Sequence, residues 1–141
     1  MGPTKIPIRV RNDHTKVDAT FVWCIDPRFR AALWSLEKTL GIKHSDVIKV
    51  AGGGKVLVNN GYARRFILEQ LEVSVKLHDP KVIYLMFHFD CGAYKPLRLP
   101  KGQNEKIFLE LQGKKAKKAL KDVKLPVKIV IVDFNELTIL D

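Results

Sequence analysis

The hydrophobic positions of this chain fall into short continuous apolar runs, separated by longer stretches in which apolar residues recur every three or four positions. Continuous runs of this length are typical of buried strands, and the second pattern is typical of amphipathic helices. The runs predict strands at residues 19–24, 47–51, 81–87 and 127–134. The spaced positions predict helices over residues 29–40, 63–78 and 103–123.

Local signals mark where several of these elements end. Gly41 is placed as the glycine that closes a helix, and Asp79-Pro80 ends the second helix. His44-Ser45-Asp46 is typical of a turn before the second strand. In the third helix we expect the apolar stripe to face inward, with Phe108, Leu111, Ala116, Ala119 and Leu120.

Strands that alternate with helices imply right-handed crossovers and a parallel sheet covered on both faces. We therefore expect a three-layer α/β fold with a mostly parallel central sheet of about four to five strands. Two segments are candidates for its margins. Ile6, Ile8 and Val10 alternate with polar residues, which indicates a short edge strand or an arm lying on a neighbouring molecule, and residues 136–141 are suited to pair at an edge.

Length and composition narrow the class of protein. The chain has 141 residues, 46% of them hydrophobic, and we expect one domain spanning residues 1–141. No apolar run is as long as a membrane span, and the first residues lack the apolar core of a signal peptide, so we expect a cytoplasmic protein. Its two cysteines are then expected as metal ligands, catalytic thiols or core residues rather than as a disulfide.

The formal net charge is +10, and the segment Lys114–Lys124 contributes six lysines and one aspartate to it. A basic chain attracts anions in general, including nucleic acids, membrane surfaces and bicarbonate. No aromatic residues interleave with these lysines as stacking platforms for bases. We therefore interpret the segment as a solvated helix face and expect neither a nucleic-acid partner nor a membrane partner.

A glycine cluster, Gly52-Gly53-Gly54-Lys55, suggests a phosphate-binding loop, but the pattern is incomplete. That loop requires glycine where Lys49 stands and serine or threonine where Val56 stands. The glycines are better suited to let the backbone pass close to a site, or to supply amides to an anion. The candidate residues for lining a pocket or contacting an anion in this way are Ala51, Gly52 and Gly53, together with Gly92.

Two strands end in residues that bind metals. Cys24 follows the apolar run 19–23, and His88 and Cys91 follow the run 82–87. In parallel sheets the carboxyl ends of strands meet at one edge, so the distance between these residues in sequence does not prevent contact. Two thiolates and one imidazole suit zinc, and three protein ligands leave a fourth position for water, as in catalytic zinc sites.

Three motifs carry a resemblance to a known family. They are Cys24-x-Asp26-x-Arg28, Ala51-Gly52 and His88-x-x-Cys91-Gly92, each following a predicted strand. In order and spacing they resemble the β-class carbonic anhydrases, over roughly the stretch from Phe21 to Ala93. The resemblance implies one zinc per chain and a carbonate dehydratase, a lyase in which a zinc-bound hydroxide converts carbon dioxide to bicarbonate. It also implies a homodimer or higher homo-oligomer.

The resemblance also implies roles for neighbouring residues. Asp26 and Arg28 stand where the family has a catalytic dyad, in which aspartate paired to arginine leaves the zinc open for water. Asp90 is expected either to orient a ligand or to cap a turn. The family usually has serine where Pro27 stands, and Arg-Asn where Lys49-Val50 stand. Aromatic residues expected in the pocket wall are Tyr62, Phe89 and Tyr94.

Three alternatives remain open from the sequence. A zinc enzyme of similar design can hydrolyse carbon disulfide or carbonyl sulfide, which are also linear molecules with a central electrophilic carbon. A catalytically silent domain can keep zinc for structure and bind an acidic partner through Lys114–Lys124. A thiol enzyme can use Cys91 as nucleophile and His88 as base, which leaves the pairing of Asp26 and Arg28 unexplained.

Overall fold

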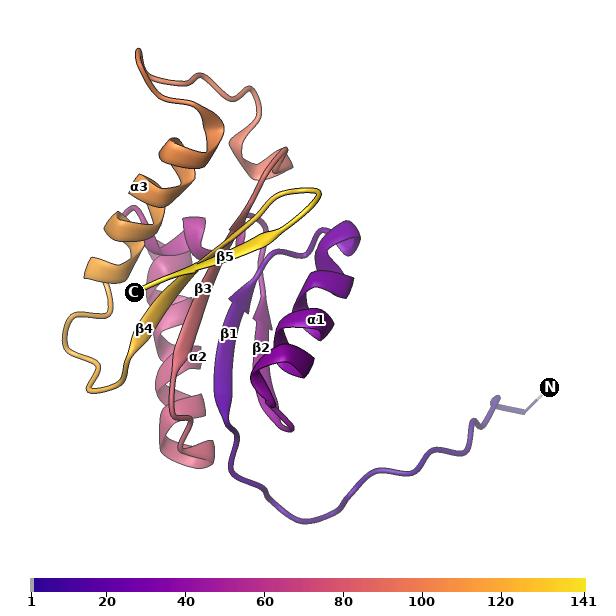
Figure 1. Cartoon of the computed structure of the whole chain (residues 1–141). Helices are drawn as coiled ribbons and strands as arrows, with labels where there is room; N and C mark the ends of the chain where they lie inside the picture. The colour runs from indigo at the N-terminus through magenta and orange to yellow at the C-terminus, as the bar shows by residue number, and fades with distance from the viewer. Residues whose placement is uncertain (1) are drawn as a thin grey trace.

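A computed structural model describes residues 2–141, which build one five-stranded sheet (Figure 1). The strand order is β2-β1-β3-β4-β5. The first four strands are parallel and β5 runs antiparallel to β4, so the tail does pair at an edge. The strands are β1 (Ala19–Trp23), β2 (Ser45–Lys49), β3 (Ile83–His88), β4 (Val127–Val132) and β5 (Leu137–Leu140). The predicted fold class is confirmed.

Helices cover both faces of the sheet. They are α1 (Arg30–Leu40), α2 (Tyr62–His78) and α3 (Glu105–Lys118). Figure 1 shows α1 on one side of the sheet, with α2 and α3 on the other. Because successive strand residues point to opposite faces, Phe21 and Trp23 pack with α1, whereas Val22 packs with α2 and α3. The sheet thus has a separate apolar core on each face.

Two predicted boundaries differ from the structure, and polar side chains explain the first. Residues 44–46 were expected to form a turn, but β2 begins at Ser45, in register with Ala19 of β1. Ser45 donates a hydrogen bond to Glu37 over 2.8 Å, and the hydroxyl of Ser74 donates one to Asp46 over 2.7 Å. These partners satisfy two polar residues in the strand. At its other end β2 stops at Lys49, before the predicted Ala51.

The third helix is shorter than predicted, but four of the five residues expected inward do contact the core, since Ala116 and Leu120 are buried and Phe108 and Ala119 pack against them. The helix ends at Lys118, and Leu111, expected inward, is 38% exposed. The residues facing the core are Leu109, Gly113 and Ala116. A β-carbon on Gly113 would lie 2.5 Å from Cγ2 of Ile129, so the glycine allows close approach of α3 to β4. Because glycine has no side chain, the contact of Gly113 with β4 leaves no apolar signal in the sequence.

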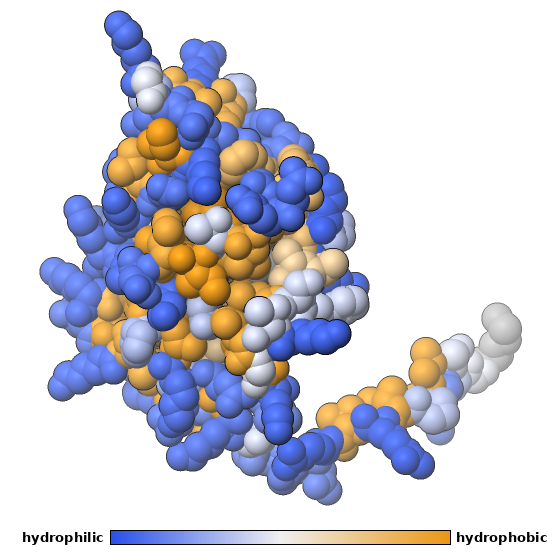
Figure 2. All heavy atoms as spheres, viewed as in Figure 1, coloured by the Kyte–Doolittle hydropathy of each residue, from blue (hydrophilic) through white to orange (hydrophobic). Residues whose placement is uncertain are grey.

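The segment before β1 extends away from the body of the protein as an arm (Figures 1 and 2). Ile6, Ile8 and Val10 are 78%, 78% and 76% exposed and belong to no strand, so the edge-strand interpretation is wrong within this chain. An arm lying on a neighbouring molecule remains a prediction. Within residues 2–141, none of the helices combines the length and the apolar character that crossing a membrane requires.

Candidate metal centre

The structure brings Cys24, His88 and Cys91 together at the carboxyl edge of the sheet. Cys24 directly follows β1, His88 is the last residue of β3, and these two strands are parallel neighbours. One potential ligand atom from each residue lies within 4.8 Å of the others, and the two sulfurs are 4.0 Å apart. All three residues are at most 5% exposed. The arrangement is compact enough for one metal ion to contact all three.

The turn between His88 and Cys91 depends on Asp90. Its backbone has φ of 55°, in the left-handed region that asparagine and aspartate tolerate better than most residues. This conformation reverses the chain directly after β3, so that Cys91 returns toward the last residue of the strand. A short 3₁₀ turn, Gly92–Tyr94, then carries the chain away.

His88 presents one ring nitrogen to the cluster. Its Nδ1 lies 2.6 Å from the carbonyl oxygen of Phe89, so Nδ1 carries the proton and donates it to that oxygen. Nε2 then carries a lone pair, and it is buried without a hydrogen-bond partner in the part of the chain that the structure describes. An unpartnered buried polar atom is rare in folded proteins. A metal ion between Nε2 and the two sulfurs would satisfy it.

The two thiols interact directly, because their sulfurs lie 4.0 Å apart. A hydrogen bond from the Cys91 thiol lowers the pKa of Cys24 to about 4, with further help from the backbone amides of Asp26 and Gly52. The same interaction, together with burial, raises the pKa of Cys91. The lowered pKa favours the thiolate form of Cys24, which is the form that binds metals. Two sulfur donors and one imidazole match the donor set that zinc prefers, and the residues fit that ion.

Asp26 and Arg28 form an ion pair at the margin of the cluster. Nε and Nη2 of Arg28 donate to Oδ2 of Asp26 over 3.1 and 2.8 Å. The backbone N–H of Arg28 also donates to Oδ1, so Asp26 caps the short 3₁₀ turn Pro27–Phe29. Pro27 suits the first position of that turn. Hydrogen bonds from Arg28 hold the pKa of Asp26 below its usual value, and Oδ2 lies 3.9 Å from Nε2 of His88.

Asp90 contacts Arg28 rather than any of the three candidate ligands. Its Oδ2 accepts from Nη1 of Arg28 over 3.1 Å, and its carbonyl oxygen accepts from Nη2 over 3.1 Å. Lys95 lies 2.7 Å from the other carboxylate oxygen and, with Arg28, holds the pKa of Asp90 below its usual value. Asp90 thus both forms the turn and fixes the arginine that holds Asp26.

A hollow of about 440 Å³ opens onto the cluster. It is lined by Cys24, Ile25, Asp26, Pro27, Ala51, Gly52, Cys91, Gly92 and Ala93. The expected aromatic wall is wrong, because none of the three predicted aromatics lines this hollow. Tyr94 instead packs edge-on against Phe108 and donates its hydroxyl to Gln112, while Tyr62 lines a separate hollow beside β2. Phe89 packs into the core beneath α2 and α3.

Sequence reasoning missed two contributors to the site. The ring of Phe29 stacks on His88 with centroids 4.0 Å apart, although its spacing indicated only a helix stripe. Ile25 lies at the mouth of the hollow and is 59% exposed, with no sequence signal to distinguish it from any other apolar residue after a strand.

Gly53 lies beneath the hollow rather than in its wall, which corrects its expected place among the pocket residues. Its φ is 56°, and a β-carbon there would overlap the carbonyl oxygen of Met86 and lie 3.2 Å from the amide nitrogen of Cys24. Only glycine therefore lets this loop approach β1 and β3 so closely.

We expect Gly53→Ala to lower the free energy of unfolding by more than about 3 kcal/mol, because strain and overlap add. Gly41→Ala is the matched control, since Gly41 has φ of 67° but open space around it. That control should lose only about 1–2 kcal/mol from backbone strain. Urea denaturation measures the free energy of unfolding of both variants. Equal losses of stability would show that the loop at Gly53 does not approach Met86 tightly.

The chain is similar to proteins of a known family. Residues 14–137 match the family described as "Putative carbonic anhydrase". Uncharacterized proteins of Rickettsia conorii and Rickettsia bellii are each 29% identical over 99 residues, which is 65% of this chain and 53% and 60% of theirs. The chain thus spans between half and three fifths of the length of these relatives.

Two solved structures share the fold. Carbonic anhydrase from Streptococcus mutans has a TM-score of 0.61 at 16% identity, over 99% of this chain and 88% of that one. Beta-carbonic anhydrase isoform I from Trichomonas vaginalis has a TM-score of 0.59 at 19% identity, over 94% and 87%. Since the family match covers most of the sequence, this chain belongs to that carbonic anhydrase family.

Proposed function

We propose that this chain catalyses the reversible hydration of carbon dioxide to bicarbonate, with one zinc ion held by Cys24, His88 and Cys91. The observation that carries the proposal is the buried Nε2 of His88, which has no partner in the described residues and lies beside two sulfurs. Structural neighbours named as carbonic anhydrases share the fold. A single zinc also accounts for the use of both cysteines in the chain.

When bound, zinc would act as a Lewis acid that lowers the pKa of a water molecule and so supplies a nucleophile near neutral pH. The chain's own residues do the rest. Asp26 Oδ2 would accept a hydrogen bond from the attacking water, a role supported by its distance of 3.9 Å from Nε2 of His88. Arg28 orients that carboxylate through two donors on one side.

The hollow suits a small uncharged substrate. Ile25, Pro27 and Ala93 give its wall an apolar character, and the backbone of Gly52 lies beside the sulfur of Cys24. Apolar walls admit carbon dioxide, which carries no charge, and reduce the number of water molecules that compete for the reacting position.

Stopped-flow measurement of carbon dioxide hydration, beside elemental analysis of the same sample, tests the proposal. We expect close to one zinc per chain and hydration that disappears when the metal is removed by a chelator and returns with added zinc. A sample with full zinc and no hydration would overturn the proposal. The same sample would then be assayed with carbon disulfide and carbonyl sulfide.

We also propose that the chain works as a homodimer or a larger homo-oligomer in the reducing cytoplasm, where two free thiols persist. The arm supports association, because Ile6, Ile8 and Val10 leave apolar side chains in solvent at one end of the chain. Light scattering should give at least twice the chain mass of 16.1 kDa. A mass of one chain at micromolar concentration would refute this part of the proposal.

A further inference from the structure

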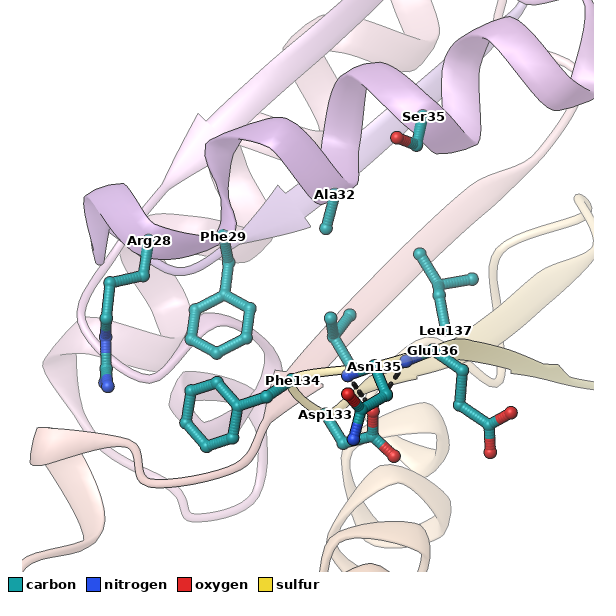
Figure 3. A pocket seen from close by; sticks show the side chains of 10 residues that line it. Arg28, Phe29, Ala32, Ser35, Asp133, Phe134, Asn135, Glu136 and Leu137 are labelled. Carbon is teal, nitrogen blue, oxygen red and sulfur yellow. Dashed lines mark hydrogen bonds between the residues drawn. The ribbon is translucent and has the colours of Figure 1, made fainter.

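The guanidinium of Arg28 lies against two aromatic rings (Figure 3). Its Cζ is 5.5 Å from the centroid of Phe29 and 5.5 Å from the centroid of Phe134. The two rings are 5.8 Å apart and tilted by 38°. Phe29 is 3% exposed, whereas Phe134 is 61% exposed in the turn between β4 and β5. An exposed ring from a distant segment thus lies against the arginine that holds Asp26.

The turn that carries Phe134 is fixed by its own hydrogen bonds. Oδ1 of Asp133 accepts from the amides of Asn135 and Glu136 over 2.7 and 2.6 Å, as the dashed lines in Figure 3 mark. The amide of Asp133 donates to the carbonyl oxygen of Glu136 over 3.1 Å. Antiparallel pairing of β4 with β5 closes the loop on both sides. The ring is therefore held in place despite its exposure.

Arg28 binds two carboxylates at once and has space beside it. Both Asp26 and Asp90 accept hydrogen bonds from it. A hollow of about 310 Å³ opens beside it, between α1 and the β4–β5 turn, and Phe134 forms part of its wall (Figure 3). The Arg28 side chain is 47% exposed, so solvent weakens each of its ion pairs. Contact with aromatic faces restricts the guanidinium further.

We propose that Phe134 is a positioning residue that holds Arg28 against Asp26 and so keeps the Asp26 carboxylate away from the point shared by the two sulfurs and His88. Its link to catalysis rests on the proposed function. Phe134 is also linked to His88 through Phe29, because the ring of Phe29 stacks on the histidine and lies beside the ring of Phe134. Removing the Phe134 ring lets Arg28 turn into the hollow, and Asp26 then moves toward Nε2 of His88, 3.9 Å away.

The test compares Phe134→Ala, Phe134→Leu and Phe134→Trp. The first readout is the hydrogen exchange of the Arg28 Nε–H signal with solvent, measured by NMR in metal-free protein, since this exchange speeds up when the group loses its hydrogen bonds to Asp26. The second is the visible absorption of cobalt(II)-loaded protein, which reports whether water or a carboxylate completes the metal coordination. Phe66→Ala is the control, since Phe66 is also half-exposed but lies on α2.

We expect Phe134→Ala and Phe134→Leu to speed the exchange of the Arg28 signal, to shift the cobalt spectrum, and to lower kcat/KM for hydration about two- to fivefold. Phe134→Trp should restore all three, because it keeps an aromatic face. An unchanged exchange rate of the Arg28 signal in Phe134→Ala, or a leucine variant that behaves as wild type, would overturn the inference. Wild-type protein without hydration would refute the proposed function, while the exchange of the Arg28 signal would still decide the role of Phe134.

Discussion

Replacing Cys91 with serine should abolish zinc binding and hydration together. A serine hydroxyl stays protonated at neutral pH and is a poor ligand for zinc, whereas the thiol is deprotonated when it binds the metal. Zinc content should fall from near one per chain to a level near zero. The rate of hydration should fall by at least about a thousandfold, because without the metal no nucleophilic water is generated near neutral pH.

Wild-type protein stripped with a chelator and reloaded is the matched control for Cys91→Ser. Zinc at about a hundredfold above its Kd should stabilise the wild type by about 2.7 kcal/mol, which raises Tm by roughly 5–10 °C. The variant should show no such rise, and Cys24→Ser should behave in the same way. A Cys91→Ser protein that keeps zinc and activity would remove Cys91 from the ligand set.

The meeting of Cys24, His88 and Cys91 could be predicted from the sequence because each follows an apolar run. Parallel strands deliver their carboxyl ends to one edge, and neither β1 nor β3 has an interruption that would shift its end. The pairing of Asp26 with Arg28 could also be predicted from the sequence, since both residues lie in one short turn. Local spacing and strand direction together were sufficient for this part of the site.

Other features depend on contacts that local spacing does not encode. The close approach of α3 to β4 depends on the fit of Gly113 against Ile129, and a glycine adds nothing to an apolar stripe. Asp90 reaches Arg28 only because its left-handed backbone turns the chain back. Phe134 reaches the same arginine only because β5 pairs with β4. These contacts come from tertiary packing between distant segments.

Replacing Asp26 with asparagine should leave zinc content unchanged and lower kcat/KM for hydration by about 10²- to 10⁴-fold. Asparagine has nearly the same shape, but one of its two terminal atoms is a donor. It can no longer form the same ion pair with Arg28 or accept from water with either terminal atom. The loss should therefore appear in the chemistry and not in metal binding, which separates Asp26 from the three candidate ligands.

The chain contains a close control for this change. Arg11 and Asp13 form an ion pair of 2.6 Å with the same spacing of two residues, at an exposed position in the arm. Asp13→Asn removes the same kind of ion pair from the surface, where such pairs contribute little to stability, and should leave kcat/KM at the wild-type value. Equal effects of the two substitutions would show that Asp26 has no special role.

Arg28→Lys tests whether Arg28 acts through Asp26. Lysine keeps the positive charge but cannot present two donors in a fixed plane to one carboxylate. If Arg28 acts through Asp26, the variant that combines Asp26→Asn with Arg28→Lys should lose no more activity than Asp26→Asn alone. Both changes would then remove the same function, the correctly oriented carboxylate. If the losses multiply instead, the two residues act separately, and Arg28 has a function of its own beyond orienting the carboxylate.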